Sequence, residues 1–186
     1  MTCRRSSTPS PETRPKRYPR SCVDEYRIEL ARRDDATTLA QMSERFVETG
    51  LRPAWGAVRI GWHIRHPDSV VLAARRGQGI AGFAIMRYGD DWAHLNLLAV
   101  DPGHRRRGLA RTLLTWLEVS ALTAGTFSIG LELRAQNLIA RAFYGALGYQ
   151  ETGEIPGYYQ GVESAIRLKR DVRVSREAPG TRQPSP

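Results

Sequence analysis

Residues 26–168 switch between strand-like and helix-like spacing of apolar side chains. Alternation predicts strands at 26–30, 69–75, 80–88, 93–100 and 127–133, then two short strands near 149–152 and 162–168. Helical spacing predicts four helices: after Asp34-Asp35, from Pro53, from Leu109 to Gly125, and from Asn137 to Leu147. This order predicts a single-domain α/β (α+β) fold, a mixed sheet of six to seven strands flanked by about four helices.

The last predicted helix carries an aromatic residue away from its apolar side. We expect this helix to bury five apolar side chains, Leu138, Ile139, Ala142, Phe143 and Ala146. Tyr144 lies off that stripe, on the side of Asn137 and Arg141. Core packing does not explain a tyrosine there, so it is either an exposed residue without a role or a functional one.

The strand predicted at 127–133 places a carboxylate among small residues. Its apolar side chains are Phe127, Ile129, Leu131 and Leu133, and the opposite side carries Ser128, Gly130, Glu132 and Arg134. Glu132 can therefore act as a general base that takes a proton from an amine, directly or through a water. The alternative is a carboxylate that is solvated or paired with a neighbour such as Arg134.

The segment from Asp101 to Ala110 joins a buried strand to the start of an amphipathic helix. Free backbone N–H groups and the helix dipole favour an anion at such a start. Gly108 and Ala110 are small enough to let a phosphate approach the backbone, and residues 105–107 are all arginine. The segment predicts a cradle for a diphosphate, the alternative being a solvated basic helix start. The Walker and dinucleotide patterns are absent from the sequence.

Val100-Asp-Pro followed by Arg105-x-x-Gly-x-Ala110 resembles the acetyl-CoA-binding signature of the GNAT superfamily of N-acetyltransferases. Two later blocks, Glu132-Leu-Arg-Ala-Gln-Asn137 and Ala142-Phe-Tyr-Gly-Ala-Leu-Gly-Tyr149, are similar to the segment that follows in that superfamily. The likeness is greatest to ribosomal-protein-alanine N-acetyltransferases and covers about residues 95–168. It implies a GNAT-like sheet with acetyl-CoA as cosubstrate and no metal.

The resemblance also implies a role for each matched residue. Glu132 would be the general base, Tyr144 would donate a proton to the departing sulfur, and Asn137 would lie along the pantetheine arm besides capping its helix. A backbone N–H near the end of the fourth strand would stabilise the oxyanion. Acetyl-CoA would be held by Leu98, Ala99, Val100, Arg105, Arg106, Arg107, Gly108, Leu109, Ala110 and Arg111.

The acceptor is indicated by a later segment. Tyr158-Tyr159 and Glu163-Ser-Ala165 are similar to elements that border the peptide groove of N-terminal acetyltransferases, although Gly157 stands where Arg is frequent and Ser164 replaces Asp. An α-amine, with a pKa of roughly 7.7–8.0, loses its proton more easily than lysine at about 10.4, which suits a modest base. We therefore expect a protein or peptide N-terminal amine. A small amine such as an amino acid, polyamine or drug is the alternative, and the tyrosines are then turn and packing residues.

Other aromatic and basic residues are expected to be structural. His63, His66 and His94 could serve as bases, but lone histidines are more often part of the packing. Trp55 and Trp62 are expected to anchor the second helix, although they could instead line the acceptor pocket.

The net charge of +9 over 186 residues would suggest a nucleic-acid partner if it lay on the folded region. Residues 1–22, however, hold six Lys/Arg against one acidic residue. We expect a disordered basic arm at 1–23, an N-acetyltransferase domain at 24–170 and a disordered tail at 171–186, with no nucleic-acid partner. A module that binds nucleic acid through the arms and an organelle transit peptide are the alternatives, the latter opposed by four prolines in the arm.

Cysteine usage and hydropathy exclude several classes. Cys3 and Cys22 both lie in or beside the arm and lack a partner at metal-ligand spacing, which argues against a disulfide scaffold and a zinc site. No apolar run approaches the roughly 20 residues of a membrane span. We therefore expect a cytoplasmic protein with no membrane partner.

Overall fold

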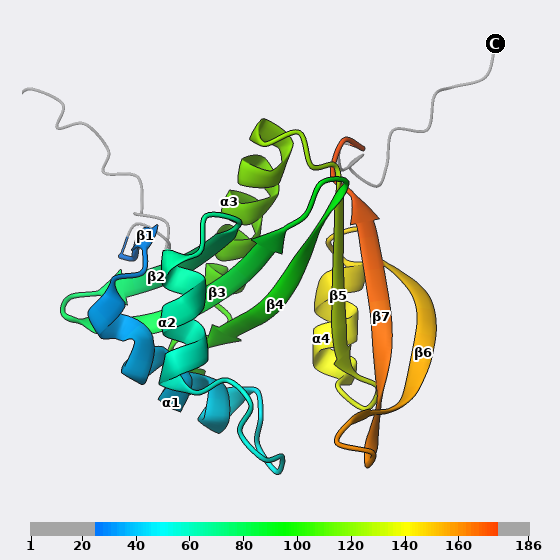
Figure 1. Ribbon diagram of the computed structural model, residues 1–186, viewed down its shortest axis with the longest axis horizontal. Coiled ribbons are helices and arrows are strands. Elements are labelled where there is room, and N and C mark those ends of the chain that lie inside the picture. Colours follow the sequence, from blue (N-terminus) through cyan, green and yellow to red (C-terminus); the bar gives the residue numbers. More distant parts are fainter. Residues whose placement is uncertain (1–24, 175–186) are drawn as a thin grey trace, which may run out of the picture.

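The computed structural model describes residues 25–174, and its elements follow the predicted order (Figure 1). The expected arm at 1–23, both cysteines and residues 175–186 of the expected tail lie outside the described residues, and the division of the chain into arm, domain and tail stays a prediction. The strands are β1 (Arg27–Leu30), β2 (Ser69–Arg76), β3 (Gly79–Tyr88), β4 (Trp92–Val100), β5 (Ser128–Arg134), β6 (Gln150–Tyr159) and β7 (Glu163–Asp171). The helices are α1 (Ala36–Phe46), α2 (Ala57–Arg65), α3 (Leu109–Thr123) and α4 (Leu138–Gly145), with short 3₁₀ turns at Arg33–Asp35 and Pro102–His104.

Within residues 25–174, seven strands form one sheet in the order β1-β2-β3-β4-β5-β7-β6. Neighbouring strands are antiparallel except β4 and β5, which run parallel with α3 as the crossover between them. The predicted mixed sheet with four helices is confirmed. The single parallel pair places the ends of β4 and β5 at the same edge of the sheet.

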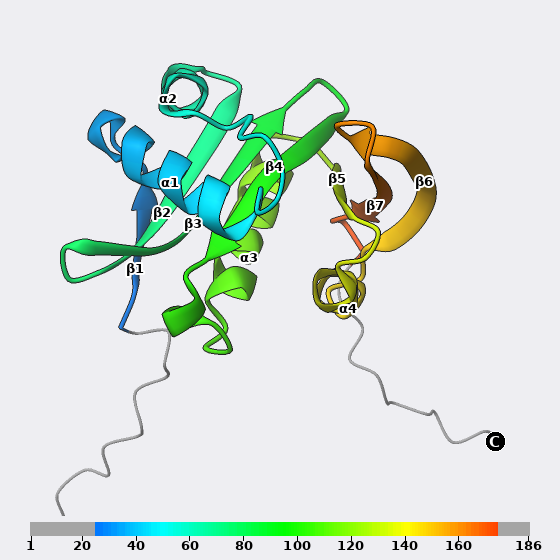
Figure 2. The same ribbon diagram turned by 90° about the horizontal axis from the view of Figure 1, so that it is seen from below.

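Helices cover both faces of the sheet (Figure 2). On one face α1 and α2 bury Leu39 and Ile60 against Phe83, and on the other α3 buries its apolar stripe, as predicted. Each fully buried leucine or phenylalanine contributes roughly 1.5–3 kcal/mol relative to an exposed one, so both layers stabilise the sheet that carries β4. No helix in the described part of the chain is long and apolar enough to cross a membrane.

Glycines in the left-handed region begin and end α3. Gly108 precedes the first turn with a φ of +80°, and Gly125 follows the last with a φ of +79°. At the C-terminal end the N–H of Thr126 donates to Ala121 O and the N–H of Gly125 donates to Leu122 O. This pair of bonds is the Schellman motif, which explains why the helix stops where the sequence predicted.

The second helix differs from its prediction in start and orientation. Pro53 does not lie in its first turn, because Glu48 Oε1 accepts the backbone N–H of Ala54 at 2.6 Å and holds this stretch as a loop ahead of α2. Val58 is 87% exposed and Trp62, expected to anchor this helix, is 41% exposed, so neither side chain lies in the core. The buried residues of α2 are Ile60, Gly61 and His63.

The last two strands are longer than predicted. Pro156 and Gly157, expected in a loop, lie within β6, where the register with β7 shifts between Ile155 and Tyr159. β6 is an edge strand of the described sheet, and an edge strand tolerates a proline because one side of its backbone has no strand partner. The irregularity places Tyr158 and Tyr159 at the end of this strand.

Candidate active site

β4 and β5 pair at their beginnings and then separate. Their parallel register runs from Trp92 opposite Ser128 to His94 opposite Gly130. A cavity of about 630 Å³ lies at the separation, lined by residues 94–98 of β4, residues 131–134 of β5, the loop between α1 and α2, α4 and the end of β6. The gap between the two strands is visible in Figure 1. The sheet thus opens where the sequence predicted catalytic chemistry.

A β-bulge in β4 lies beside this opening. Met86 of β3 is opposite Leu95 and Ile85 is opposite Leu97, so Asn96 has no counterpart on β3. A bulge bends its strand and redirects side chains, which accords with the separation of β4 from β5. Leu98, two residues further on, also lines the cavity.

Glu132 is held by two basic groups at the cavity wall. Its Oε2 lies 2.6 Å from His94 Nε2, and its Oε1 accepts from Arg167 Nε at 2.9 Å. The alternative of a paired carboxylate is therefore met, but by Arg167 and His94 and not by Arg134, whose Nε lies 2.9 Å from Glu163 Oε2. His94, expected to be structural, comes from β4 to meet the carboxylate of β5 in the cavity.

The contacts shift the pKa values of both partners. The hydrogen bond with His94 and the nearby Arg167 lower the pKa of Glu132 despite its partial burial, so it is ionised at neutral pH. Burial lowers the pKa of His94, but its hydrogen bonds with Glu132 and Asn96 outweigh this effect and raise it above its usual 6.5. The pair is therefore a carboxylate beside an imidazole that readily holds a proton.

Tyr144 is not on an exposed polar face, which corrects the predicted orientation of α4. It is 7% exposed and packs edge-on against Tyr149 with ring centroids 5.4 Å apart, while Leu138 is 68% and Ile139 81% exposed. The helix packs on the core through the side that carries Ala140, Phe143 and Tyr144, so Leu138, Ile139, Ala142 and Ala146 of the predicted stripe remain exposed. Burial raises the pKa of Tyr144, which also lines the cavity and has no hydrogen-bond partner for its hydroxyl among the described residues.

Asn137 has the predicted capping role. Its Oδ1 accepts the backbone N–H of Ala140 at 3.0 Å at the start of α4. The residue also lines the cavity, next to the end of β5. Its placement along a pantetheine arm stays a prediction.

The predicted cradle continues from the end of β4. Arg105 Nε donates to Val100 O at 3.0 Å, and Arg106 adopts a left-handed φ of 63°. The side chains of residues 105–107 are exposed, and Gly108 opens the first turn of α3 beside them. Leu109 is buried in the core and Ala99 packs under α1, so only their backbones are available to a ligand.

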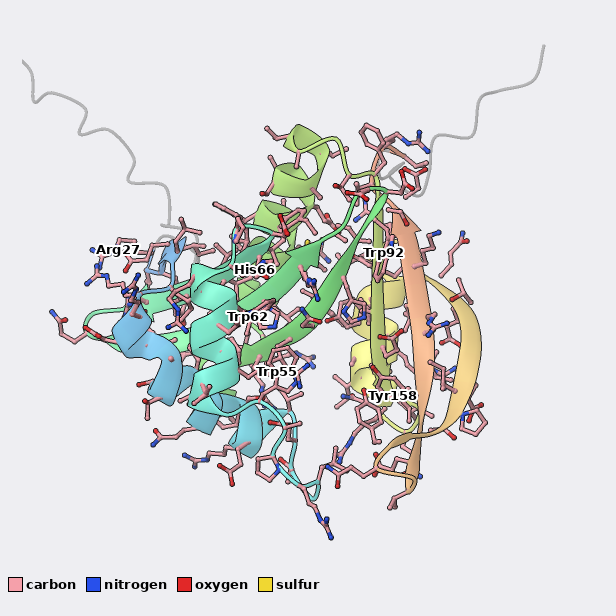
Figure 3. All side chains as sticks on the ribbon, viewed as in Figure 1. Arg27, Trp55, Trp62, His66, Trp92 and Tyr158 are labelled. Atoms are coloured by element: carbon pink, nitrogen blue, oxygen red, sulfur yellow. The ribbon has the colours of Figure 1, made fainter. Side chains whose placement is uncertain are left out.

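Two loops meet over the other end of the cavity. Gln160 binds the backbone of Arg52 twice: its Oε1 accepts from N at 3.1 Å and its Nε2 donates to O at 2.8 Å. Trp55 and Tyr158 lie on opposite sides of the opening (Figure 3). The guanidinium of Arg59 stacks on Trp55 at 3.8 Å from the ring centroid. Trp55 thus lines the cavity rather than serving only as an anchor.

Comparison with known proteins accounts for this arrangement. A sequence model described as acetyltransferase (GNAT) family matches residues 16–149. The chain belongs to the GNAT acetyltransferase family. Over 90 residues it is 43% identical to the [ribosomal protein bS18]-alanine N-acetyltransferase of Salmonella typhimurium, and over 86 residues 39% identical to the N-terminal acetyltransferase B complex catalytic subunit naa20 of Schizosaccharomyces pombe. These alignments span 47% and 46% of this chain but only 61% and 48% of the two relatives.

Solved GNAT structures share the fold over most of the chain. The ribosomal-protein-S18-alanine N-acetyltransferase from Escherichia coli matches with a TM-score of 0.70 and 26% identity, covering 84% of this chain and 99% of that one. Arabidopsis thaliana NAA60, solved in complex with acetyl-CoA, matches with a TM-score of 0.69 at 16% identity, covering 80% and 99%. The latter likeness shows the fold alone.

Several residues of this GNAT cavity were not found from the sequence. Arg167 reaches Glu132 because β7 pairs with β5 in a register that puts the two residues opposite each other. The sequence pattern left His94 as an isolated residue. It placed Gln160 between the last two predicted strands and gave it no contact. The one usable signal was the alternation in β5, which placed Glu132 on the correct side of its strand.

Proposed function

We propose that this GNAT chain is an acetyl-CoA-dependent N-acetyltransferase that moves the acetyl group directly to the α-amine of a protein or peptide. One observation carries the proposal: the ionised Glu132 lines a cavity between β4 and β5, and the same β4 leads into the arginine-rich start of α3. Relatives named as N-terminal and ribosomal-protein acetyltransferases support the reaction type.

The cosubstrate fits the residues present at the start of α3. The diphosphate of acetyl-CoA would meet the backbone amides of residues 108–111 and the side chains of residues 105–107, where the helix dipole and guanidinium groups both favour anions. Leu98, Ala99 and Val100 would contact the thioester arm through the edge of β4, and Asn137 would border it from the side of α4. Within residues 25–174 no cluster of His, Cys, Asp or Glu could hold a metal ion.

The chemistry then follows from the groups at the cavity wall. Glu132 accepts the proton that the attacking amine loses. The oxyanion would be stabilised by a backbone N–H of β4 near Leu98. Tyr144 would donate a hydrogen bond to the leaving sulfur; because a thiolate with a reference pKa of about 8.5 is already a tolerable leaving group, alignment of amine and thioester contributes more than this proton.

In this proposal the acceptor reaches Glu132 from the other end of the cavity. Tyr158 and Tyr159 would border the peptide, and the Gln160–Arg52 bonds hold their strand to the loop before α2. A small amine is the second candidate acceptor, because Gly157 and Ser164 depart from the peptide-groove pattern of N-terminal acetyltransferases.

An acceptor screen tests the proposal. Purified protein is incubated with acetyl-CoA and peptides with free N-termini, the same peptides with blocked N-termini but a free lysine, and a panel of small amines. We expect one acetyl group on the free α-amine, located by tandem mass spectrometry, and little on the lysine. Acetylation confined to small amines would favour the second candidate, and no transfer to any amine would refute both.

A further inference from the structure

The contact between Glu132 and His94 determines which of these two side chains holds the proton that the acceptor amine loses. His94 Nε2 lies 2.6 Å from Glu132 Oε2, and His94 Nδ1 lies 2.8 Å from Asn96 Oδ1. An amide oxygen only accepts, so Nδ1 carries a hydrogen and Nε2 is the nitrogen that gains or loses a proton against the carboxylate. Asn96 sits at the bulge of β4, so the bulge places this amide oxygen beside Nδ1.

Glu132 alone has too low a pKa to be an efficient base toward an α-amine. A glutamate with a reference pKa of about 4.3 lies more than three units below an α-amine at roughly 7.7–8.0, a mismatch of over a thousandfold in proton affinity. Arg167 and His94 lower the pKa of Glu132 further. General base catalysis works best when the base has a pKa near the working pH, and an imidazole satisfies this condition.

We propose that Glu132 and His94 act as a coupled pair, in which Glu132 receives the proton of the acceptor amine and His94 Nε2 holds it. His94 is then a positioning residue that acts through Glu132, and this inference rests on the proposed acetyl transfer. Arg167 on the other carboxylate oxygen favours the ionised form of Glu132, so the added proton resides on the imidazole.

Acetyl transfer moves one proton from the amine to the pair. The amine nitrogen forms a bond to the acetyl carbon and the carbon–sulfur bond breaks, with its electron pair leaving on sulfur. The amine proton passes to Glu132 Oε2 and on to His94 Nε2, giving an imidazolium beside a carboxylate. The thiolate accepts a hydrogen bond from Tyr144 and takes its proton from solvent, and the pair releases its own proton to solvent before the next turnover.

The surrounding groups leave the pair as the titrating unit near neutral pH. Arg167 from β7 contacts the other carboxylate oxygen of Glu132, and the ring of Trp92 meets His94 edge-on with centroids 5.8 Å apart. Burial raises the pKa of Tyr158, and it raises the pKa of Tyr159 to about 12, so both phenols of β6 remain protonated. Because the pKa of His94 is raised, the base form of the pair appears as the pH rises above 6.5, and activity should rise with it.

The first test compares pH profiles of kcat/KM for one peptide acceptor. The acceptor amine titrates identically with every variant, so differences between profiles belong to the protein. We expect His94→Gln to lower kcat by about 10- to 100-fold, leave the KM for acetyl-CoA unchanged and remove the inflection above pH 6.5. Glu132→Gln should remove the same inflection. His66→Gln, at the C-terminal end of α2 and outside the cavity lining, is the matched control and should keep the wild-type profile.

The second test follows the imidazole directly by ¹⁵N NMR on the full chain without substrates. We expect His94 to titrate above 6.5 as the Nδ1–H tautomer, and its pKa to fall in Glu132→Gln. His94→Asn, checked for folding by thermal unfolding, replaces His94→Gln if that variant is unstable. A wild-type pH profile in either His94 variant, or a His94 pKa unaffected by Glu132→Gln, overturns the pair. If NMR finds the coupling but the wild-type protein acetylates no amine, the proposed function fails and the catalytic role of the pair fails with it.

Discussion

Replacing Gly108 by glutamate should weaken acetyl-CoA binding, and Gly125→Glu is its matched control. The two glycines lie at opposite ends of α3 with φ values of +80° and +79°. A side chain in this left-handed region costs roughly 1–2 kcal/mol. Both variants therefore carry the same backbone strain and the same added charge.

The helix dipole makes the two variants differ in stability. A carboxylate at a helix N-terminus is stabilising by about 0.3–1 kcal/mol and is destabilising by a similar amount at the C-terminus. Combined with the strain, Gly108→Glu should lower the free energy of unfolding by about 1 kcal/mol and Gly125→Glu by about 2 kcal/mol. Urea unfolding at low ionic strength measures both values.

The effect on acetyl-CoA binding should be larger for Gly108→Glu than for Gly125→Glu. A carboxylate about 4 Å from a phosphate charge costs about 1 kcal/mol in water and about 4 kcal/mol near a protein surface, which raises the Kd by roughly fivefold to several hundredfold. Calorimetry with acetyl-CoA should find this increase for Gly108→Glu, reduced by added salt, and a wild-type Kd for Gly125→Glu. Equal Kd values in the two variants would refute a diphosphate site at the start of α3.

Three further changes test other parts of the molecule. Tyr144→Phe should lower kcat by about 10- to 100-fold, since a hydrogen bond to a charged sulfur is worth roughly 1.5–3 kcal/mol, while urea unfolding stays within about 1 kcal/mol of wild type; an unchanged kcat would remove the tyrosine from the mechanism. Gln160→Ala removes two bonds to the backbone of Arg52 and should raise the KM for a peptide about 3- to 10-fold without changing the acetyl-CoA Kd, as steady-state kinetics and calorimetry can check. Burial lowers the pKa of His63 to about 4, so the unfolded state binds its proton first on acidification, and stability should fall between about pH 6.5 and 4 by up to about 3 kcal/mol. Urea unfolding of His63→Gln should show a flatter dependence on pH, and an identical slope would contradict the assignment.

The sequence was most informative where a pattern reports directly on local geometry. The alternation in β5 placed Ile129 and Leu131 in the core and Glu132 on the other side, as observed. The stripe of α3 and its terminal glycines were also predicted, because helical spacing and left-handed glycines are properties of a few neighbouring residues.

The orientation of α4 and the partners of Glu132 could not be predicted from such local patterns. Leu138 and Ile139 are apolar, yet α4 packs on the core through the side that carries Ala140, Phe143 and Tyr144. This helix has apolar residues on two sides, and hydrophobic spacing alone does not decide which side reaches the core. The approach of His94 to Glu132 depends on the parallel register of β4 with β5, and such long-range register leaves no mark in either strand alone.

Transfer of radiolabelled acetyl groups in a single turnover shows whether the acetyl group passes directly to the amine with the help of Glu132. Wild-type protein in excess over labelled acetyl-CoA is mixed with a peptide bearing a free N-terminus, and the label is followed from thioester to peptide, with Glu132→Gln alongside. We expect label on the peptide α-amine without prior label on the protein, and much slower transfer in Glu132→Gln. Label that first accumulates on the protein, or that reaches the peptide equally fast in Glu132→Gln, would contradict direct transfer assisted by this carboxylate.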